Sequence, residues 1–158
     1  MGRIAARFRI LFYVHTAKQG GSTIKETYCI LLAEDNPADA FLVEEALSLT
    51  NLNFTLMKAI NGEAASLKLA NLEQDKVEVA LILLDLNLPK ISGHQLLTQV
   101  RTSEYLRSTP VIVLTSSDSP QDRLRAAALH VSYYFRKPSD LGEFMKLGNI
   151  VETIVLNR

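Results

Sequence analysis

Short apolar runs alternate along this chain with segments of helical periodicity. Apolar residues that repeat every three or four positions are typical of a helix with one buried face. Such stripes predict helices around 42–47, 96–100 and 124–128, and a last helix from 141 to 154, all with the stripe in the core. The apolar runs between them predict five strands: TYCILLA (27–33), FTLMKAI (54–60), VALILLD (79–85), PVIVLT (110–115) and VSYYFRK (131–137).

This alternation of strands and helices predicts an α/β fold. Fully apolar strands separated by helices are typical of a parallel sheet that is covered on both faces. We therefore expect a doubly wound, flavodoxin-like sheet of five parallel strands in the order 2-1-3-4-5. A chain of 158 residues has the usual size of one domain, which we place at 27–158.

The segment before this domain differs from it in charge. Residues 1–25 contain five basic residues and no acidic one, which leaves 12 basic against 17 acidic residues in the rest of the chain. Gly20-Gly21-Ser22 is typical of a flexible junction. We predict a basic, flexible extension over 1–26. The chain as a whole has no net charge, so its charge gives no reason to expect a nucleic-acid partner.

Two further features bear on the cellular compartment. Cys29 is the only cysteine and cannot form an internal disulfide, which fits a reducing compartment. No apolar run approaches the roughly 20 residues that a membrane helix needs. We expect a cytoplasmic protein without a membrane partner.

Reactive polar groups follow four of the five predicted strands. In an open parallel sheet these strand ends lie on one edge, the carboxyl edge, where ligands bind. Four of the strands are consecutive neighbours in the predicted order, so their terminal side chains should converge on one site. These residues are Glu34 and Asp35, Asp85, Thr115, and Lys137.

The chemistry of this set favours phosphoryl transfer. Glu34, Asp35 and Asp85 bring three negative charges together, and a hard divalent cation such as Mg²⁺ relieves that repulsion. Lys137 adds a cation and Thr115 a hydroxyl donor for an anion with several oxygens. Phosphoryl transfer depends on positioning and charge stabilisation more than on a base, which makes Asp85 the candidate nucleophile.

The same residues resemble a known family, the receiver domains of two-component response regulators. The matches are the pair Glu34-Asp35, Asp85 in LLDLNLPKISG, Thr115 in VIVLTSS, and the pair Lys137-Pro138. They span about 27–155 in the right order. LLDLNLPK and ALHVSYYFRK are most similar to the small stand-alone regulators that are paired with phytochrome-type histidine kinases.

The resemblance implies a role for each matching residue at the metal site. Asp35, Asp85 and the backbone carbonyl of Asn87 are expected to bind Mg²⁺, with Glu34 acting mainly through water. Glu34 stands where many family members have aspartate.

The resemblance also implies a switch and a turn. Thr115 and Tyr134 are expected to report phosphorylation, and the small Ser116 leaves room for a phosphodonor. The peptide bond between Lys137 and Pro138 is predicted to be cis, so that the lysine turns back into the site.

Taken one at a time, these residues have ordinary explanations. Thr115 could cap a helix and Lys137 could be a solvated lysine. His15, His94 and His130 lack metal-ligand spacing and are expected to be surface or satisfied residues. Only the joint pattern favours a site.

Other classes of protein with related folds fit less well. A flavodoxin needs a neutral phosphate-binding loop, which the acidic AEDNPAD does not provide. An aspartyl phosphatase needs a second acid two residues after Asp85, where Asn87 stands.

We therefore expect a single-domain response regulator that accepts a phosphoryl group on Asp85. The donor would be a sensor histidine kinase or a histidine phosphotransfer protein, and the protein would be no enzyme beyond its own phosphorylation and dephosphorylation. Its output would be protein contact, and three forms of it stay open: a phosphorelay intermediate, a homodimer made through the fourth and fifth helices, or a regulator of an unlinked effector. The alternative is a pseudo-receiver that binds partners without phosphorylation.

Overall fold

The structure, a computed structural model, describes residues 26–158. The extension predicted at 1–26 lies outside the described residues, apart from Glu26. All five strands are parallel and form one sheet in the order β2-β1-β3-β4-β5, which confirms the predicted fold class. The strands are β1 (Thr27–Ala33), β2 (Asn53–Ala59), β3 (Leu81–Asp85), β4 (Val111–Thr115) and β5 (Tyr133–Arg136).

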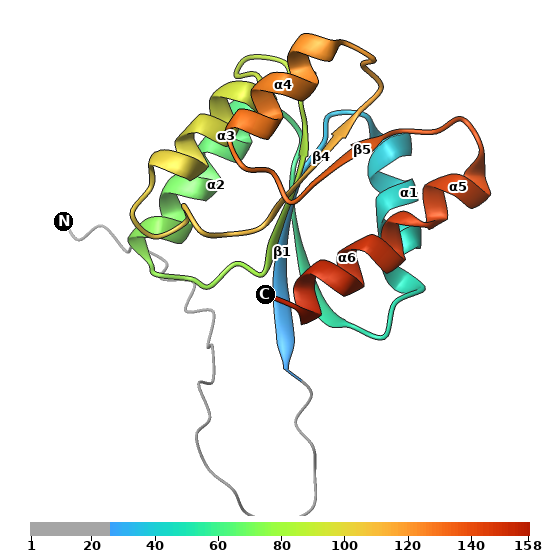
Figure 1. The fold of residues 1–158 in the computed structure, drawn as a ribbon. Helices are drawn as coiled ribbons and strands as arrows, with labels where there is room; N and C mark the ends of the chain where they lie inside the picture. The colour runs from blue at the N-terminus through green and yellow to red at the C-terminus, as the bar shows by residue number, and fades with distance from the viewer. Residues whose placement is uncertain (1–25) are drawn as a thin grey trace, which may run out of the picture.

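Helices cover both faces of the sheet (Figure 1). The helices α1, α5 and α6 lie on one face, and α2, α3 and α4 lie on the other. No helix in the described part of the chain is long and apolar enough to cross a membrane. The helices are α1 (Pro37–Ser48), α2 (Gly62–Gln74), α3 (Gly93–Thr102), α4 (Pro120–Ala128), α5 (Leu141–Met145) and α6 (Leu147–Leu156).

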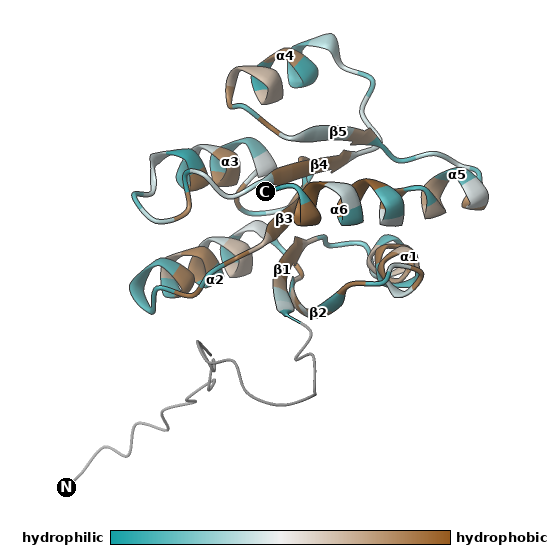
Figure 2. Cartoon of the chain, turned by 60° about the horizontal axis from the view of Figure 1, so that its bottom comes forward, coloured by the Kyte–Doolittle hydropathy of each residue, from teal (hydrophilic) through white to brown (hydrophobic). Residues whose placement is uncertain are grey.

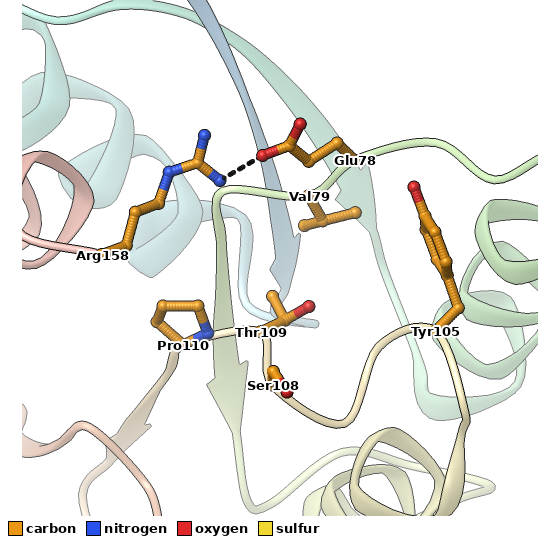
Figure 3. A pocket seen from close by; sticks show the side chains of 7 residues that line it. All are labelled: Glu78, Val79, Tyr105, Ser108, Thr109, Pro110 and Arg158. Carbon is orange, nitrogen blue, oxygen red and sulfur yellow. Dashed lines mark ion pairs between the residues drawn. The ribbon is translucent and has the colours of Figure 1, made fainter.

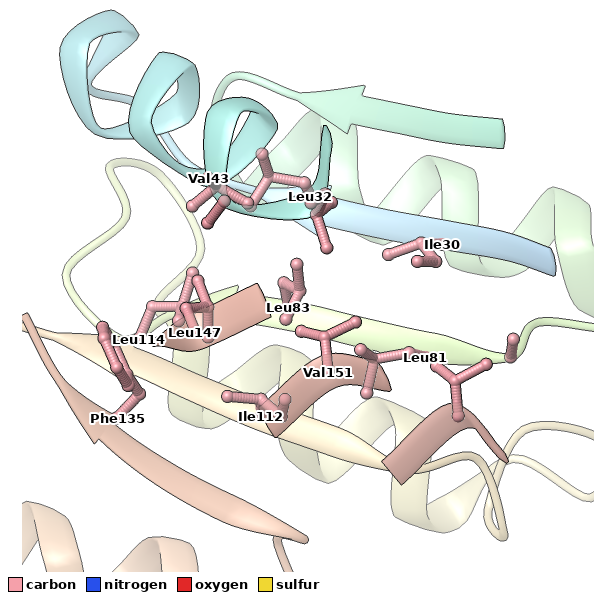
Figure 4. Packing of buried hydrophobic residues seen from close by; sticks show 14 of the residues in the cluster. Ile30, Leu32, Val43, Leu81, Leu83, Ile112, Leu114, Phe135, Leu147 and Val151 are labelled. Carbon is pink, nitrogen blue, oxygen red and sulfur yellow. The ribbon is translucent and has the colours of Figure 1, made fainter. Parts of the chain in front are cut away.

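The sheet divides the apolar interior into two cores. Successive side chains of a strand point to opposite faces, so Ile30 enters one core and Leu31 the other. Every residue of β3 and β4 is buried, as expected for central strands covered on both sides. Figure 2 shows these strands as apolar ribbons between the helices. We call the core that contains Ile30 the first core and the one that contains Leu31 the second core. Figure 4 shows Val43 of α1 and Val151 of α6 in the first core.

Side-chain caps fix where most helices begin. The side chain of Asn36 accepts hydrogen bonds from the first turn of α1, and Asn61 does the same for α2. Ser92 and Gln95 form a capping box at α3, and Ser119 caps α4. These caps place the helix starts on the carboxyl edge of the sheet, beside the strand ends.

One helix was not predicted from the apolar pattern. The helix α2 lies between β2 and β3 and buries Ala65, Leu69 and Leu72 in the second core. Their spacing of four and three residues is a helical signal that polar neighbours and small residues partly obscure.

The predicted apolar stripe of α4 is wrong. Leu124 is 69% exposed, and Ala127 and Ala128 are exposed as well. The buried residue of this helix is Ala126, which packs against Leu86 and Val113. Helical spacing alone does not say which side of a short helix faces the sheet.

The last helix is divided at Lys146 into α5 and α6. Phe144 and Val151 are buried as predicted, while Leu141 is 60% exposed.

The predicted cis bond between Lys137 and Pro138 is also wrong, since no peptide bond within residues 26–158 is cis. The trans form is intrinsically favoured by about 0.5–1 kcal/mol before proline. A cis peptide bond is not needed to direct Lys137 into the site. Its N–H donates to the carbonyl of Thr115 at 2.8 Å, and its side chain reaches Asp85 with the peptide bond trans.

Candidate functional site

The structure brings all the predicted polar strand ends to the carboxyl edge. Asp85 is the last residue of β3 and Thr115 the last of β4, and these strands are neighbours. Glu34 follows β1 directly, and Lys137 follows β5 directly. Glu34, Asp85 and Thr115 are buried, with 3%, 5% and 0% of their surface exposed, so the strands hold them rigidly.

Lys137 is the centre of this group. Its Nζ lies 2.7 Å from Oε2 of Glu34, 2.7 Å from Oδ2 of Asp85 and 2.9 Å from Oδ2 of Asp39. An ammonium group has three N–H donors, so all three are used. Burial acts to lower the pKa of Lys137, but the hydrogen bonds to Asp85, Glu34 and Asp39 outweigh it and raise the pKa above its ordinary value. The lysine is therefore held in its charged form.

Asp39 is a site residue that sequence reasoning missed. It lies in the first turn of α1, where an acidic residue is common because it complements the helix dipole. That explanation hid its second contact, which comes from Lys137 across the fold. Its side chain is 27% exposed, against 0% for Glu34 and 7% for Asp85.

Three carboxylates are arranged as a candidate metal centre. Oxygen atoms of Glu34, Asp35 and Asp85 all lie within 4.8 Å of one another. Burial raises the pKa of Glu34, although hydrogen bonds from Lys137 and from the N–H of Asn36 oppose this. Oxygen donors at this density are what Mg²⁺ prefers, so the residues present fit the metal.

The loop after β3 is anchored to Asp85. The N–H of Asn87 donates to Oδ1 of Asp85 at 2.8 Å, which leaves Oδ2 for Lys137. Gly93 approaches this strand end so closely that a Cβ atom would lie 2.3 Å from the carbonyl oxygen of Asp85. Any other residue at position 93 would displace the strand end or the helix.

The predicted switch residues lie on the two strands beyond β3. Oγ1 of Thr115 accepts a hydrogen bond from the N–H of Ser117 at 3.0 Å. The hydroxyl of Tyr134 is buried and has the side chain of Thr115 as its hydrogen-bonding neighbour. Burial raises its pKa, and the guanidinium of Arg123 lies 4.8 Å from the centre of its ring.

A hollow opens at the amino edge of the sheet, opposite the carboxyl edge (Figure 3). It has a volume of about 520 Å³. The charge of Arg158 is matched there by Glu78, whose Oε1 lies 2.9 Å away. None of the converging carboxylates is near, so the chemistry belongs to the carboxyl edge. The lining residues are Glu78, Val79, Tyr105, Ser108, Thr109, Pro110 and Arg158.

Comparison with known proteins shows the family of this chain. Residues 30–148 match the family described as the response regulator receiver domain, and this chain belongs to that family. Response regulator Rcp1 of Synechocystis sp. is 36% identical over 131 residues, which cover 80% of this chain and 88% of that protein. The probable methanogenesis regulatory protein FilR2 of Methanothrix harundinacea is 39% identical over 117 residues, which cover 72% and 74%.

Solved structures show the same relationship. The phosphorylated cyanobacterial phytochrome response regulator RcpA superposes with a TM-score of 0.69 at 33% identity, over 82% of this chain and 91% of that one. The Mn(2+)-bound form of Rcp1 superposes with a TM-score of 0.67 at 33% identity, over 80% and 91%. This chain is thus a receiver domain similar to phytochrome-associated response regulators.

Proposed function

We propose that this protein accepts a phosphoryl group on Asp85 in a reaction that requires Mg²⁺. This proposal rests on one observation: a lysine and two further acidic residues surround the buried carboxylate of Asp85. Asp85 offers Oδ2 to Lys137 at 2.7 Å and shares the acidic cluster with Glu34 and Asp35. The phosphorylated RcpA and the Mn(2+)-bound Rcp1 support the same reaction and the same kind of metal.

The chemical step follows from these positions. A carboxylate oxygen of Asp85 forms a bond to phosphorus as the bond from phosphorus to the donor's imidazole nitrogen breaks. The electron pair of that bond returns to the nitrogen, which then takes up a proton. Lys137 binds an oxygen of the transferred group, and the hydroxyl of Thr115 donates to another.

The metal is expected to be held by Asp35, Asp85 and the carbonyl of Asn87, with Glu34 acting through water. When bound, Mg²⁺ supplies positive charge against the phosphoryl oxygens. Lys137 has three donors on three carboxylates, and it would exchange one of these carboxylates for a phosphoryl oxygen.

The proposed donor is a sensor histidine kinase or a histidine phosphotransfer protein, and we favour a phytochrome-type kinase. The similarity to RcpA and Rcp1 supports this pairing. We place the receiver domain at 27–158, with 1–26 as a separate basic extension, and the reaction in the cytoplasm. The protein would catalyse only its own phosphorylation and dephosphorylation.

The proposed output is a change in protein contacts at the face formed by α4, β5 and α5, including a homodimer. Three large apolar side chains are exposed there: Leu124 at 69%, Tyr133 at 44% and Leu141 at 60%. Tyr134 lies on β5 beside Tyr133. Together with Thr115, it is expected to respond to the phosphoryl group.

A small phosphodonor tests the reaction without a kinase. Wild-type protein is incubated with acetyl phosphate, with and without Mg²⁺, and its intact mass is measured. We expect one added phosphoryl group that depends on Mg²⁺ and is lost in Asp85→Asn. Asp118→Asn is the matched control, because it removes an exposed carboxylate that pairs with Arg136. Labelling that persists in Asp85→Asn would contradict the proposal and name another acceptor, and a wild type that stays unlabelled would favour the pseudo-receiver.

A further inference from the structure

The helix α4 is weakly packed against the body of the protein. Ala126 is the only buried residue among its nine, all of which the structure describes. Burial of one alanine supplies little hydrophobic stabilisation, since the gain scales with the apolar area removed from water. The position of α4 therefore depends on polar contacts more than that of the other helices does.

Asp122 makes the main polar contacts of α4. Its Oδ1 lies 3.1 Å from Nε2 of His94, which comes from α3. Its Oδ2 accepts a hydrogen bond of 2.9 Å from the hydroxyl of Ser117 in the loop after β4. A carboxylate only accepts hydrogen bonds, so His94 donates from Nε2. These bonds lower the pKa of Asp122, which keeps it charged.

Ser117 continues this chain of contacts into the phosphoryl site. Its backbone N–H donates to Oγ1 of Thr115 at 3.0 Å, while its hydroxyl donates to Asp122. Thr115, Ser117, Asp122 and His94 are thus connected by three consecutive hydrogen bonds. The path leads from the end of β4 through α4 to α3, two helices that lie side by side in Figure 1.

A buried polar atom without a hydrogen-bond partner lies at the same place. Within residues 26–158 this is Nδ1 of His94, the ring of which contacts Asp122 through Nε2. An unpaired buried polar group costs free energy. The atom lies beside α4, so this arrangement of the helix leaves a favourable contact unmade.

We propose that Asp122 is a positioning residue that couples the phosphoryl site to α4. His94 holds Asp122, Asp122 holds the side chain of Ser117, and Ser117 holds Oγ1 of Thr115 in the arrangement of the unphosphorylated protein. Movement of Thr115 toward a phosphoryl group breaks its contact with Ser117. That loss loosens Asp122 and releases α4. The inference rests on the proposed phosphorylation of Asp85.

The direction of the coupling follows from the contacts. The chain from Thr115 to His94 stabilises the unphosphorylated arrangement, so it opposes any ligand that draws Thr115 toward Asp85. Weakening the chain should tighten the binding of such a ligand, because a ligand shifts an equilibrium by its differential affinity for the two states. The coupling is reciprocal, so the ligand should also alter the surroundings of His94.

The substitution Asp122→Asn tests this with beryllofluoride as the phosphoryl mimic. Asparagine keeps the shape but has one acceptor oxygen, so it cannot hold His94 and Ser117 together. Beryllofluoride is titrated at saturating Mg²⁺, and binding is followed by NMR, including the His94 imidazole. We expect the dissociation constant to fall at least about fivefold, a usual size for linked sites. Ser117→Ala should give the same change, and the double variant no more than either.

Controls separate this inference from the reaction on which it rests. Asp118→Asn, in the loop that precedes α4 and with the same change of charge as Asp122→Asn, should bind like the wild type. A wild type that binds no beryllofluoride contradicts the proposed function and this inference with it. A wild type that binds, with unchanged or weaker affinity in Asp122→Asn or a His94 resonance that does not move, overturns the coupling alone.

Discussion

At the scale of single residues, the site depends on how many charges surround one lysine. Glu34, Asp39 and Asp85 contact Lys137, and Asp35 lies within the same acidic cluster. Four carboxylates face one ammonium group, so a net negative charge remains. That excess is the electrostatic basis for the divalent-cation site that we propose at this edge of the sheet.

The contribution of Asp39 can be measured directly. Asp39→Asn removes one charge near the cluster but leaves both other partners of Lys137 in place. Coulomb's law in a largely aqueous surrounding gives a loss of about 1 kcal/mol for Mg²⁺ binding, so its dissociation constant should rise roughly threefold to tenfold. Isothermal titration calorimetry measures this. Glu63→Gln, which removes an exposed partner of Lys90, is the control. Equal affinities in all three proteins would show that Asp39 does not act on the metal.

Most of the site residues could be predicted from the sequence, and the reason is specific. Asp85 and Thr115 end apolar runs, so their place at the carboxyl edge followed from strand direction. Asp39 and Asp122 could not be found in this way, because both stand in the first turn of a helix, where an acid is ordinary. Their partners come from distant parts of the chain.

At the scale of elements, Arg101 of α3 joins two loops that no apolar pattern predicts. Its guanidinium donates to the carbonyls of Leu129 at 2.8 Å, Thr109 at 2.9 Å, and Arg107 and His130 at 3.0 Å. Partial burial lowers the pKa of Arg101, and no carboxylate is among these partners. The residue ties the end of α3 to the starts of β4 and β5.

Loss of this connection should destabilise the fold. Arg101→Ala leaves several carbonyls without a donor, so the free energy of unfolding should fall by about 2–3 kcal/mol. Urea unfolding followed by circular dichroism measures the change. Arg107→Ala removes an exposed side chain but keeps the carbonyl that accepts from Arg101, and it should unfold like the wild type. Equal unfolding curves for both variants would show that the four bonds carry no net stability.

The contacts of Asp122 predict how the stability of the folded protein depends on pH. The pKa of Asp122 is lowered by hydrogen bonds from His94 and Ser117, so its charged form stabilises the folded state. This contribution is complete above the ordinary aspartate pKa of about 3.9 and is lost as the pH falls through the lower folded value. The stability difference between wild type and Asp122→Asn should therefore shrink as the pH falls below about 4. A difference that is the same at pH 3 and pH 6 would contradict this.

The elements themselves were predictable to different degrees. The central strands β3 and β4 were found because they are buried on both sides, which makes their apolar runs continuous. The edge strands β2 and β5 are only partly buried, and their runs contain more polar residues. The stripe of α4 was placed on the wrong side, since a helix that buries only Ala126 leaves Leu124 exposed. The helix α2 was missed although Ala65, Leu69 and Leu72 have helical spacing.

At the scale of the whole molecule, the exposed side of α4 is where output is expected. Leu124→Asp should leave stability nearly unchanged, because the side chain is 69% exposed. It should abolish any increase in mass in solution that beryllofluoride and Mg²⁺ cause in the wild type, as measured by light scattering. Leu67→Asp on α2, with the native leucine 63% exposed, is the matched control and should associate normally. Loss of association in both variants, or in neither, would place the interface elsewhere.

The central claim is that Asp85 is the phosphoryl acceptor, and chemical trapping tests it most directly. The protein is treated with acetyl phosphate and Mg²⁺, and borohydride then reduces the acyl phosphate to an alcohol, which converts the acceptor aspartate to homoserine. Peptide mapping by mass spectrometry locates the product. We predict homoserine at position 85 and at no other aspartate, with none formed when Mg²⁺ is omitted. Homoserine at position 35 or 39 would contradict the account. So would unmodified Asp85 in protein of which the intact mass shows an added phosphoryl group.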